Sequence, residues 1–334
     1  MKPPLLALAS LLLPSPAATL RLNVTANQAW IEHTPLAYTN QFSPLYHNAP
    51  GPRRNATTVL PVLAEGGVAT LSSSNRSLLV IGANAETQGL KQYATHKNYR
   101  LIYVLASVPY RLVARRASGI RPGHLGDLRN KTIATFKGSS AEVFVRTLLA
   151  DVAGLKDDDY TLVSGNMCMR EPCAENSLPE RLKRGEVDAF GCWETAPELA
   201  IQGMGEGAVA VFQNGTVYRE VFSLYATAEA LRDKKQRAEV VRYLKAVGET
   251  LEVFKKEPER AWKFVGGLLK LPEAVLRNVW ADHIWGPGSL GKDLVDYLEK
   301  EDEYLARVDK RPRMSRKELE KFVDASAYEE SLKL

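Results

Sequence analysis

The sequence predicts an α/β fold of two domains that ends in a helical region. Its 334 residues are enough for two domains at about 150 residues each. Hydrophobic residues make up 45% and charged residues 25%, a globular composition that excludes disordered, collagen-like and coiled-coil chains. Short apolar runs alternate with amphipathic helical patterns over the first two thirds, and helical patterns dominate from Thr227 onward. This order is typical of parallel sheets that are covered by helices.

Seven short runs rich in apolar and β-branched residues predict strands. Several are apolar throughout, as expected for parallel strands with helices on both faces. The predicted strands are Leu78–Ala83, Leu101–Ser107, Thr132–Phe136, Tyr160–Ser164, Val187–Trp193, Val209–Phe212 and Val221–Ala226.

Helices are predicted between these strands and after them. Ala141–Ala153 has an apolar face, and its Glu142 and Arg146 are spaced to pair on the other face. Leu178–Arg184 is followed by Gly185, a residue typical of helix ends. The C-terminal third is predicted to hold the helices Ala228–Phe254, Glu259–Leu268, Pro272–His283, Leu290–Ala306 and Ser315–Phe322.

The first 18 residues are predicted to be a signal peptide. An apolar run, Leu5–Leu13, precedes small residues, with cleavage near Ala17 or Ala18, and the run is too short to span a membrane. The net charge of +5 is spread along the chain, which predicts no nucleic-acid partner. Together with the leader, five sequons predict a secreted, extracellular glycoprotein. Their asparagines are Asn23, Asn55, Asn75, Asn130 and Asn214.

Three cysteines are expected to form one disulfide in an oxidising compartment. The simplest pair is Cys168 with Cys173, which leaves Cys192 as a buried thiol; the alternative is that Cys192 pairs with either of the others. The five histidines show no metal-ligand spacing and there is no Cys-x-x-Cys. We therefore predict neither a metal site nor a cofactor.

The central block of the chain carries a set of motifs in a fixed order. They are Ser118-Gly119-Ile120, Lys131-Thr132-Ile133, Gly138-Ser139-Ser140, Gly185-Glu186-Val187-Asp188-Ala189 and Trp193-Glu194. In these motifs the chain resembles the type II periplasmic-binding-protein superfamily. The nearest branch is that of the nitrate/sulfonate/taurine-type solute-binding proteins and the related thiamine-pyrimidine-precursor proteins. Thr195 stands where that branch usually has proline.

The resemblance implies two α/β lobes joined by two hinge crossings, with a ligand in the cleft between them. The crossings then fall near Val108–Val113 and Val217–Ala226. Lobe 1 is expected to comprise residues 19–110 plus 227–334, and lobe 2 residues 111–226. Because ligands of open α/β sheets bind beyond the carboxyl ends of strands, the residues at those ends become candidates.

Two candidate groups follow strands of lobe 2. Gly138-Ser139-Ser140 opens a helix and could offer amides and hydroxyls to an anion or a carboxylate, although Ser139 and Glu142 also fit a capping box. Trp193, Glu194 and Thr195 follow another strand, and an acid beside an aromatic ring suits an amine, amidine or pyrimidine-like ligand. Trp193 also fits the core, and Thr195 also fits a helix cap with Glu198 as its partner.

Three further groups of candidates belong to lobe 1 and the crossings. His33 and Thr34 could bind a ligand from the first strand–helix junction, although a histidine there is often a capping or surface residue. Asn84 and Glu86 occupy the next junction, where Asn84 also fits a helix cap. Ser107 ends the strand before the first crossing. The Cys168–Cys173 loop either overhangs the cleft or is a surface loop without a ligand role.

The function that these observations favour is a secreted solute-binding-like protein that holds a small polar or anionic ligand by hinge closure. No catalytic residues are predicted, because no nucleophile elbow or metal-ligand pattern is present. One alternative is an enzyme like the fungal hydroxymethylpyrimidine-phosphate synthases, whose cysteine run is replaced here by Arg219–Ser223, where only Phe222 is kept. A ligand-free secreted interaction protein is the other alternative.

Overall fold

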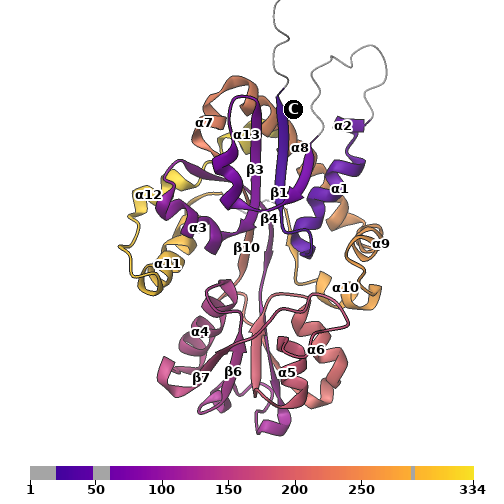
Figure 1. Cartoon of the computed structure of the whole chain (residues 1–334), viewed down its shortest axis with the longest axis vertical. Coiled ribbons are helices and arrows are strands. Elements are labelled where there is room, and N and C mark those ends of the chain that lie inside the picture. The colour runs from indigo at the N-terminus through magenta and orange to yellow at the C-terminus, as the bar shows by residue number, and fades with distance from the viewer. Residues whose placement is uncertain (1–19, 48–60, 287–289) are drawn as a thin grey trace, which may run out of the picture.

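The computed structural model describes residues 20–47, 61–286 and 290–334. The described residues form two α/β lobes, drawn one above the other in Figure 1, and each is built on its own sheet. The predicted signal peptide and Asn55 lie outside the described residues.

Lobe 1 contains a six-stranded sheet of order β11-β4-β10-β3-β1-β2. β1 pairs in parallel with β2 and β3, whereas β10 runs antiparallel to both β3 and β4. All eight residues of β10 are buried, and five of them are apolar. The strands are β1 (Arg21–Ala26), β2 (Val62–Glu65), β3 (Leu78–Ala85), β4 (Tyr99–Val108), β10 (Glu220–Thr227) and β11 (Ile284–Trp285).

Lobe 2 contains a five-stranded sheet of order β7-β6-β8-β5-β9. β6 is parallel to β7 and β8, and β5 is antiparallel to β8 and β9. Its strands are β5 (Arg111–Arg115), β6 (Thr132–Thr135), β7 (Thr161–Ser164), β8 (Ala189–Cys192) and β9 (Val209–Phe212). Its helices are α4 (Ser140–Ala153), α5 (Leu178–Arg184) and α6 (Ala196–Met204).

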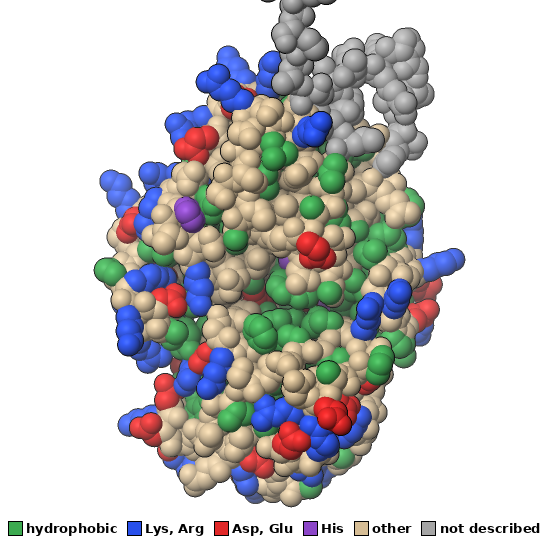
Figure 2. Space-filling view, viewed as in Figure 1, with side chains coloured by type: hydrophobic (Ala, Val, Ile, Leu, Met, Phe, Trp, Pro, Cys, Tyr) green, Lys and Arg blue, Asp and Glu red, His purple; other side chains and the backbone are tan. Residues whose placement is uncertain are grey.

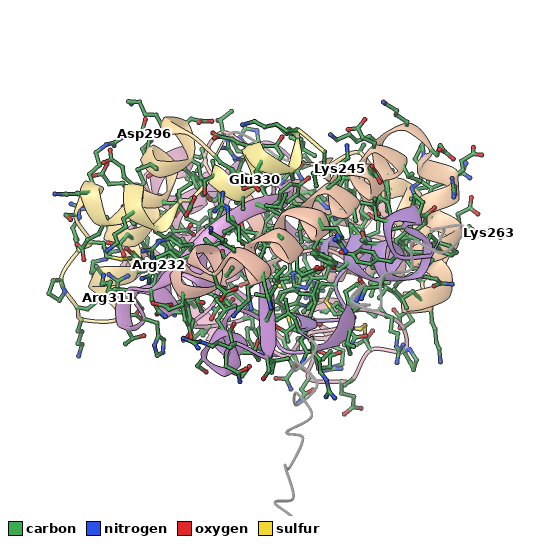
Figure 3. All side chains as sticks on the ribbon, turned by 90° about the horizontal axis from the view of Figure 1, so that it is seen from above. Arg232, Lys245, Lys263, Asp296, Arg311 and Glu330 are labelled. Atoms are coloured by element: carbon green, nitrogen blue, oxygen red, sulfur yellow. A yellow bond between two sulfur atoms is a disulfide. The ribbon has the colours of Figure 1, made fainter. Side chains whose placement is uncertain are left out.

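The remaining helices pack around the sheet of lobe 1 (Figure 1). Seen from above, Lys263 and Asp296 lie on outer helices, with their charges directed away from the sheet (Figure 3). These helices are α1 (Thr34–Phe42), α2 (Pro44–His47), α3 (Glu86–Thr95), α7 (Ala228–Arg232), α8 (Lys234–Lys256), α9 (Pro258–Leu269), α10 (Glu273–Trp280), α11 (Lys292–Val308), α12 (Arg316–Phe322) and α13 (Ser326–Ser331). None of the helices in the described part of the chain is long and apolar enough to cross a membrane.

The chain leaves the sheet of lobe 1 through β4 and returns to it through β10 (Figure 1). These two strands are hydrogen-bonded neighbours, and their register places Glu220 opposite Val108. Both connections between the sheets therefore lie at one place, beside the region where the lobes meet.

The predicted strands are all present, with small shifts at their ends, and the strands of the described residues that escaped prediction are β1, β2, β5 and β11. The single helix predicted over Ala228–Phe254 is wrong, because it is divided into α7 and α8. Asp233 causes the division: its carboxylate accepts the amide hydrogens of Lys235 and Gln236 and caps the start of α8.

Candidate functional site

Aromatic side chains of both lobes meet between them. The ring of Trp30 in lobe 1 is 5.6 Å from that of Trp193 in lobe 2, 5.1 Å from His33 and 6.1 Å from Phe222, between centroids. Phe136 lies 6.0 Å from Trp193 on the lobe 2 side. We call these five residues the aromatic cluster. Figure 2 shows hydrophobic side chains gathered across the middle of the molecule, where the two lobes face each other.

His33 is buried in this cluster and presents a hydrogen-bond acceptor. Its Nδ1 is 3.1 Å from the carbonyl oxygen of Asn27, and because a carbonyl only accepts, Nδ1 carries the proton. Nε2 has no partner among the described residues. Burial lowers the pKa of His33 to about 4 and outweighs the opposite effect of Glu32, so the ring is neutral at neutral pH.

Glu32 is buried on the same side and bonds to a second histidine. Its Oε1 is 3.1 Å from Nε2 of His283, whose Nδ1 is 2.8 Å from the carbonyl oxygen of Val279. Burial lowers the pKa of His283, but the hydrogen bond and charge of Glu32 raise it more, so the net shift is upward. Oε2 of Glu32 has no partner in the described part of the chain.

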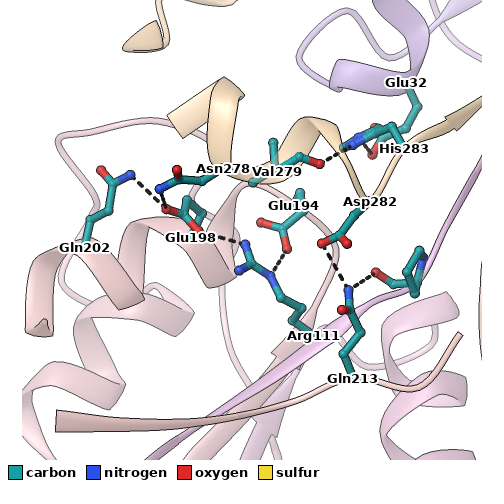
Figure 4. Close-up of polar contacts among 11 residues, drawn as sticks. Glu32, Arg111, Glu194, Glu198, Gln202, Gln213, Asn278, Val279, Asp282 and His283 are labelled. Atoms are coloured by element: carbon teal, nitrogen blue, oxygen red, sulfur yellow. Dashed lines mark hydrogen bonds and ion pairs between the residues drawn. The ribbon is translucent and has the colours of Figure 1, made fainter. Parts of the chain in front are cut away.

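Arg111 organises the lobe 2 side of the interface (Figure 4). Its guanidinium donates to Glu194 at 2.6 Å and to Glu198 at 3.0 Å. Glu198 also accepts a hydrogen bond from Asn278 of α10 at 2.7 Å, so the network reaches into lobe 1. We call Arg111, Glu194, Glu198 and Asn278 the arginine network.

Glu194 keeps one oxygen free of the arginine network. Its Oε1 accepts a hydrogen bond from Arg111, whereas its Oε2 is buried and has no donor among the described residues. Burial raises the pKa of this carboxyl, and Arg111 offsets only part of the effect. Glu194 therefore offers an unsatisfied acceptor beside the ring of Trp193.

Two threonines that were predicted to bind a ligand instead donate their hydroxyl hydrogens to backbone carbonyl oxygens. Thr195 is the N-cap residue of α6, as predicted, but its hydroxyl donates to the carbonyl oxygen of Met169 and Glu198 binds Arg111, so the predicted capping box is wrong. The hydroxyl of Thr34 donates to the carbonyl oxygen of Ile31 at 2.6 Å. Both side chains are buried and support the backbone around the aromatic cluster.

Several hydrogen-bonding groups at the start of α4 already have partners within the protein. The amide of Gly138 donates to Glu142 at 2.8 Å, and its carbonyl oxygen accepts from Lys91 of lobe 1. The hydroxyl of Ser139 accepts the amide hydrogen of Ala141, so the capping interpretation holds for Ser139, although Glu142 binds Gly138 rather than Ser139. These bonds leave less capacity for an anion than the sequence suggested.

Three buried glutamates lie beside Ser140. The Ser140 hydroxyl is 3.2 Å from that of Tyr110, and both are close enough to Glu220 to affect its pKa. Glu86, the predicted candidate, is fully buried, and its Oε2 accepts the amide hydrogen of Val221 at 2.6 Å. Its neighbours are Glu220 and Glu301. We call Glu86, Glu220 and Glu301 the glutamate cluster.

Asn84 and Ser107 occupy the margin of the interface. Asn84 is half-buried and its Oδ1 accepts the amide hydrogen of Ala85, the N-cap residue of α3, so the predicted helix cap at Asn84 is wrong. Ser107 lies in β4 between β10 and β11, and its buried hydroxyl has no partner in the described residues.

The predicted disulfide between Cys168 and Cys173 is present, and Cys192 is a buried free thiol. The disulfide loop helps to enclose a cavity of about 520 Å³ against lobe 1. Residues of both lobes line this cavity, among them Ala29, Met169 and Leu268. The loop therefore lies next to the interface, one of its two expected positions.

The predicted glycosylation sites differ in exposure. Asn75 and Asn130 are exposed, Asn214 is half-buried, and Asn23 is half-buried within β1 between β2 and β3. Glycosylation at these positions stays a prediction.

Several residues of the interface were not predicted. Arg111, Trp30, His283 and Glu220 stand in no motif, and their partners are distant in sequence. Glu301 had a detectable signal, because it continues the spacing of Leu294, Leu298 and Leu305 on the buried face of α11. A charged residue on an apolar helix face is a reason to look for a partner.

The two sheets, the paired crossing strands and the polar residues between the lobes define the two-lobed periplasmic-binding-protein fold, as the sequence motifs predicted. Residues 81–261, more than half of the chain, match the family described as NMT1/THI5 like. The chain belongs to the NMT1/THI5-like family. No curated protein matches it by sequence.

Solved structures share its fold at low sequence identity. The aliphatic sulphonate-binding protein SsuA of Escherichia coli has a TM-score of 0.67 and 16% identity, over 88% of this chain and 94% of its own. A putative sulfonate-binding SsuA of Methylobacillus flagellatus has a TM-score of 0.68 and 15% identity, over 95% and 94%. The desulfurization enzyme DSZB has a TM-score of 0.59 and 15% identity, over 94% and 99%. The same fold thus occurs in binding proteins and in an enzyme.

Proposed function

We propose that this chain is a secreted protein that binds a small ligand between its lobes and closes over it by a hinge at β4 and β10. In this proposal lobe 1 comprises residues 19–110 and 227–334 and lobe 2 residues 111–226, and β10 (Glu220–Thr227) is the crossing strand that returns from lobe 2 and pairs within the sheet of lobe 1. The adjacent crossing strands support the hinge, because two neighbouring strands can bend together. The signal-peptide and sequon patterns support secretion.

The observation that carries the proposal is a set of unpaired buried polar atoms around the aromatic cluster. Lobe 1 contributes Nε2 of His33 and Oε2 of Glu32, and lobe 2 contributes Nε1 of Trp193 and Oε2 of Glu194. Buried polar groups are almost always paired, and each one left unpaired costs about 1–3 kcal/mol. A ligand that supplied partners would offset this cost while it joined the two lobes.

The unpaired atoms favour a polar ligand that is neutral or cationic over an anionic one. Two of them are carboxylate oxygens, and Nε2 of His33 is an acceptor. These groups match hydrogen-bond donors, and the rings of Trp30 and Trp193 match a flat or cationic group. We propose an aminopyrimidine or an amidine as the ligand class.

Titration of the tryptophan fluorescence of the purified full chain tests this proposal. We expect 4-aminopyrimidine and benzamidine to change the emission of Trp30 and Trp193 saturably, and ethanesulfonate to have no effect. Glu194→Gln is expected to weaken binding at least tenfold, because it replaces an acceptor oxygen and the negative charge. The matched control is Glu186→Gln on the surface of lobe 2, where Glu186 is 46% exposed.

Unchanged affinity of the control and loss in Glu194→Gln support the proposed site. Binding of ethanesulfonate alone, or equal affinities of both variants, would overturn it. No saturable response to any of the three compounds would also count against the proposal.

A further inference from the structure

The glutamate cluster brings three carboxyl groups from separate elements into one buried place. Glu86 begins α3, Glu220 begins β10 and Glu301 lies in α11. Glu86 and Glu220 have no exposed surface and Glu301 is 5% exposed. The first two stand at the connection between the lobes, and α11 covers them from lobe 1.

This cluster has few hydrogen-bond donors for its carboxylate oxygens. Oε2 of Glu86 accepts the amide hydrogen of Val221, and Oε2 of Glu220 accepts the hydroxyl hydrogen of Tyr218 at 2.8 Å. Glu86 and Glu301 also lie close enough for a proton on one carboxyl group to bond to the other, and Glu220 lies within reach of the hydroxyls of Tyr110 and Ser140. Beyond the contact with Glu86, the oxygens of Glu301 receive no hydrogen bond from the described residues. None of the three forms an ion pair with a lysine, arginine or histidine in the described ranges.

Burial and mutual repulsion keep protons on these groups. Burial raises the pKa of Glu86 well above its ordinary value, and the charges of Glu220 and Glu301 raise it further. The pKa values of Glu220 and Glu301 are raised as well, again mainly by burial. A cation that entered would remove the cause of the repulsion and take the place of a proton.

A cavity of about 820 Å³ is lined by Glu301, whose carboxylate oxygens are themselves buried. It lies between α4 of lobe 2 and α11 of lobe 1, two helices that face each other across the gap in Figure 1. Tyr218, Tyr297 and Tyr304 line it together with Glu301, four further acidic side chains and four basic ones, among them Arg146 and Arg307. Tyrosine rings beside a carboxylate are a setting that attracts ammonium groups through ring faces and charge.

We propose that this cavity binds an organic amine, with its ammonium group held by Glu301 and the adjoining Glu86 and Glu220. The volume is far larger than a metal ion needs. No group of His, Cys, Asp and Glu in the described part of the chain is arranged to hold a metal. No residue of the aromatic cluster lines this cavity, so the proposal extends the proposed function rather than restating it.

Isothermal titration calorimetry of the full chain at pH 8 with spermidine and putrescine tests this site. We expect saturable binding of at least one amine and a loss of more than tenfold in Glu301→Gln, which keeps the shape but removes the charge. Glu303→Gln is the matched control, since Glu303 lines the same cavity on the same helix but is 62% exposed and paired with Arg313. Its affinity is expected to change less than twofold.

Further variants and titrations distinguish binding at this site from binding at the aromatic cluster. Glu194→Gln is expected to keep amine affinity, so the failure of the aromatic site and the failure of this one give different results. Glu220→Gln repeats the test if Glu301→Gln does not fold, and it is expected to lose affinity likewise. Binding of MgCl2 or CaCl2 but of neither amine overturns the proposal, as does equal affinity of Glu301→Gln and Glu303→Gln or no amine binding at all.

Discussion

The arginine network and the glutamate cluster are two solutions to the same problem. Each buries carboxylates between the lobes. In the arginine network Arg111 lies between Glu194 and Glu198 and supplies one counter-ion for the two carboxylates from within the chain. The glutamate cluster has three acids and no cation in the described residues. Since buried charges are stable only when they are paired, the first region has a cation of its own, although Oε2 of Glu194 stays unpaired, and the second is suited to an added cation.

The contrast also separates structural from ligand-binding acids. Glu198 accepts hydrogen bonds from Arg111, Asn278 and Gln202 and has no unpaired oxygen, so it serves the closed arrangement of the lobes. Glu301 accepts no hydrogen bond from an amide or a basic side chain in the described residues, although it is nearly as buried; its polar partner is the carboxyl group of Glu86. Burial alone does not identify a binding residue; the number of unsatisfied acceptors distinguishes the two.

The largest expected effect comes from removing the cation of the arginine network. Arg111→Met leaves Glu194 and Glu198 buried without a counter-ion, and we expect the free energy of unfolding to fall by about 3–5 kcal/mol. Urea unfolding followed by circular dichroism measures the change. Arg121→Met is the control, because the Arg121–Asp127 pair lies on the surface of lobe 2, and no measurable change is expected there. A loss below about 1 kcal/mol for Arg111→Met contradicts the comparison.

The next effect is a pH dependence caused by the glutamate cluster. Burial raises the pKa of Glu301 to about 8 and of Glu220 to about 7, from ordinary values of 4.5. The folded state therefore binds protons more tightly than the unfolded state. These groups stabilise the fold fully below pH 4.5, and their contribution is lost as the pH rises through 7 to 8. The expected loss is about 1.4 kcal/mol per pH unit for each proton.

The window from pH 6.5 to 8 isolates this effect. His33, with its lowered pKa, adds an opposite slope only at lower pH, whereas His283, with its raised pKa, adds to the loss. Around Glu301 the charged neighbours are Glu86, Glu220 and Asp302. Glu301→Gln should flatten the slope of unfolding free energy against pH relative to the native chain. An unchanged slope means that Glu301 is not protonated in the folded state.

The smallest expected effect is that of removing a hydrogen bond between the lobes. Asn278→Ala removes the hydrogen bond from α10 to Glu198, and we expect a cost of about 1 kcal/mol and a larger radius of gyration in small-angle X-ray scattering. Gln202→Ala is a matched control, since Gln202 donates to the same carboxylate oxygen from within lobe 2. The control is expected to keep the radius of the native chain. Equal radii in both variants would show that Asn278 does not hold the lobes together.

The fold could be predicted from the sequence because its signals are local. The apolar strand runs and the motifs around Gly138 and Trp193 specify the elements and the superfamily. The strand β5 escaped prediction since its five residues begin and end with arginine. The site was harder, because contacts such as His283 to Glu32 join residues that are distant in sequence. Polar residues at strand ends were located, but which of their atoms stay unpaired depends on the tertiary arrangement.

The pairing of Glu220 with Val108 has a consequence for how the chain can be divided. Both ends of the lobe 2 segment meet at a single rung of the sheet, so lobe 2 is, in its topology, an insertion into lobe 1. A short linker between these two positions would close lobe 1 without it, and the excised segment would have its termini side by side. The molecule can thus be separated into two units at one point on the sheet, each with its own sheet and helices.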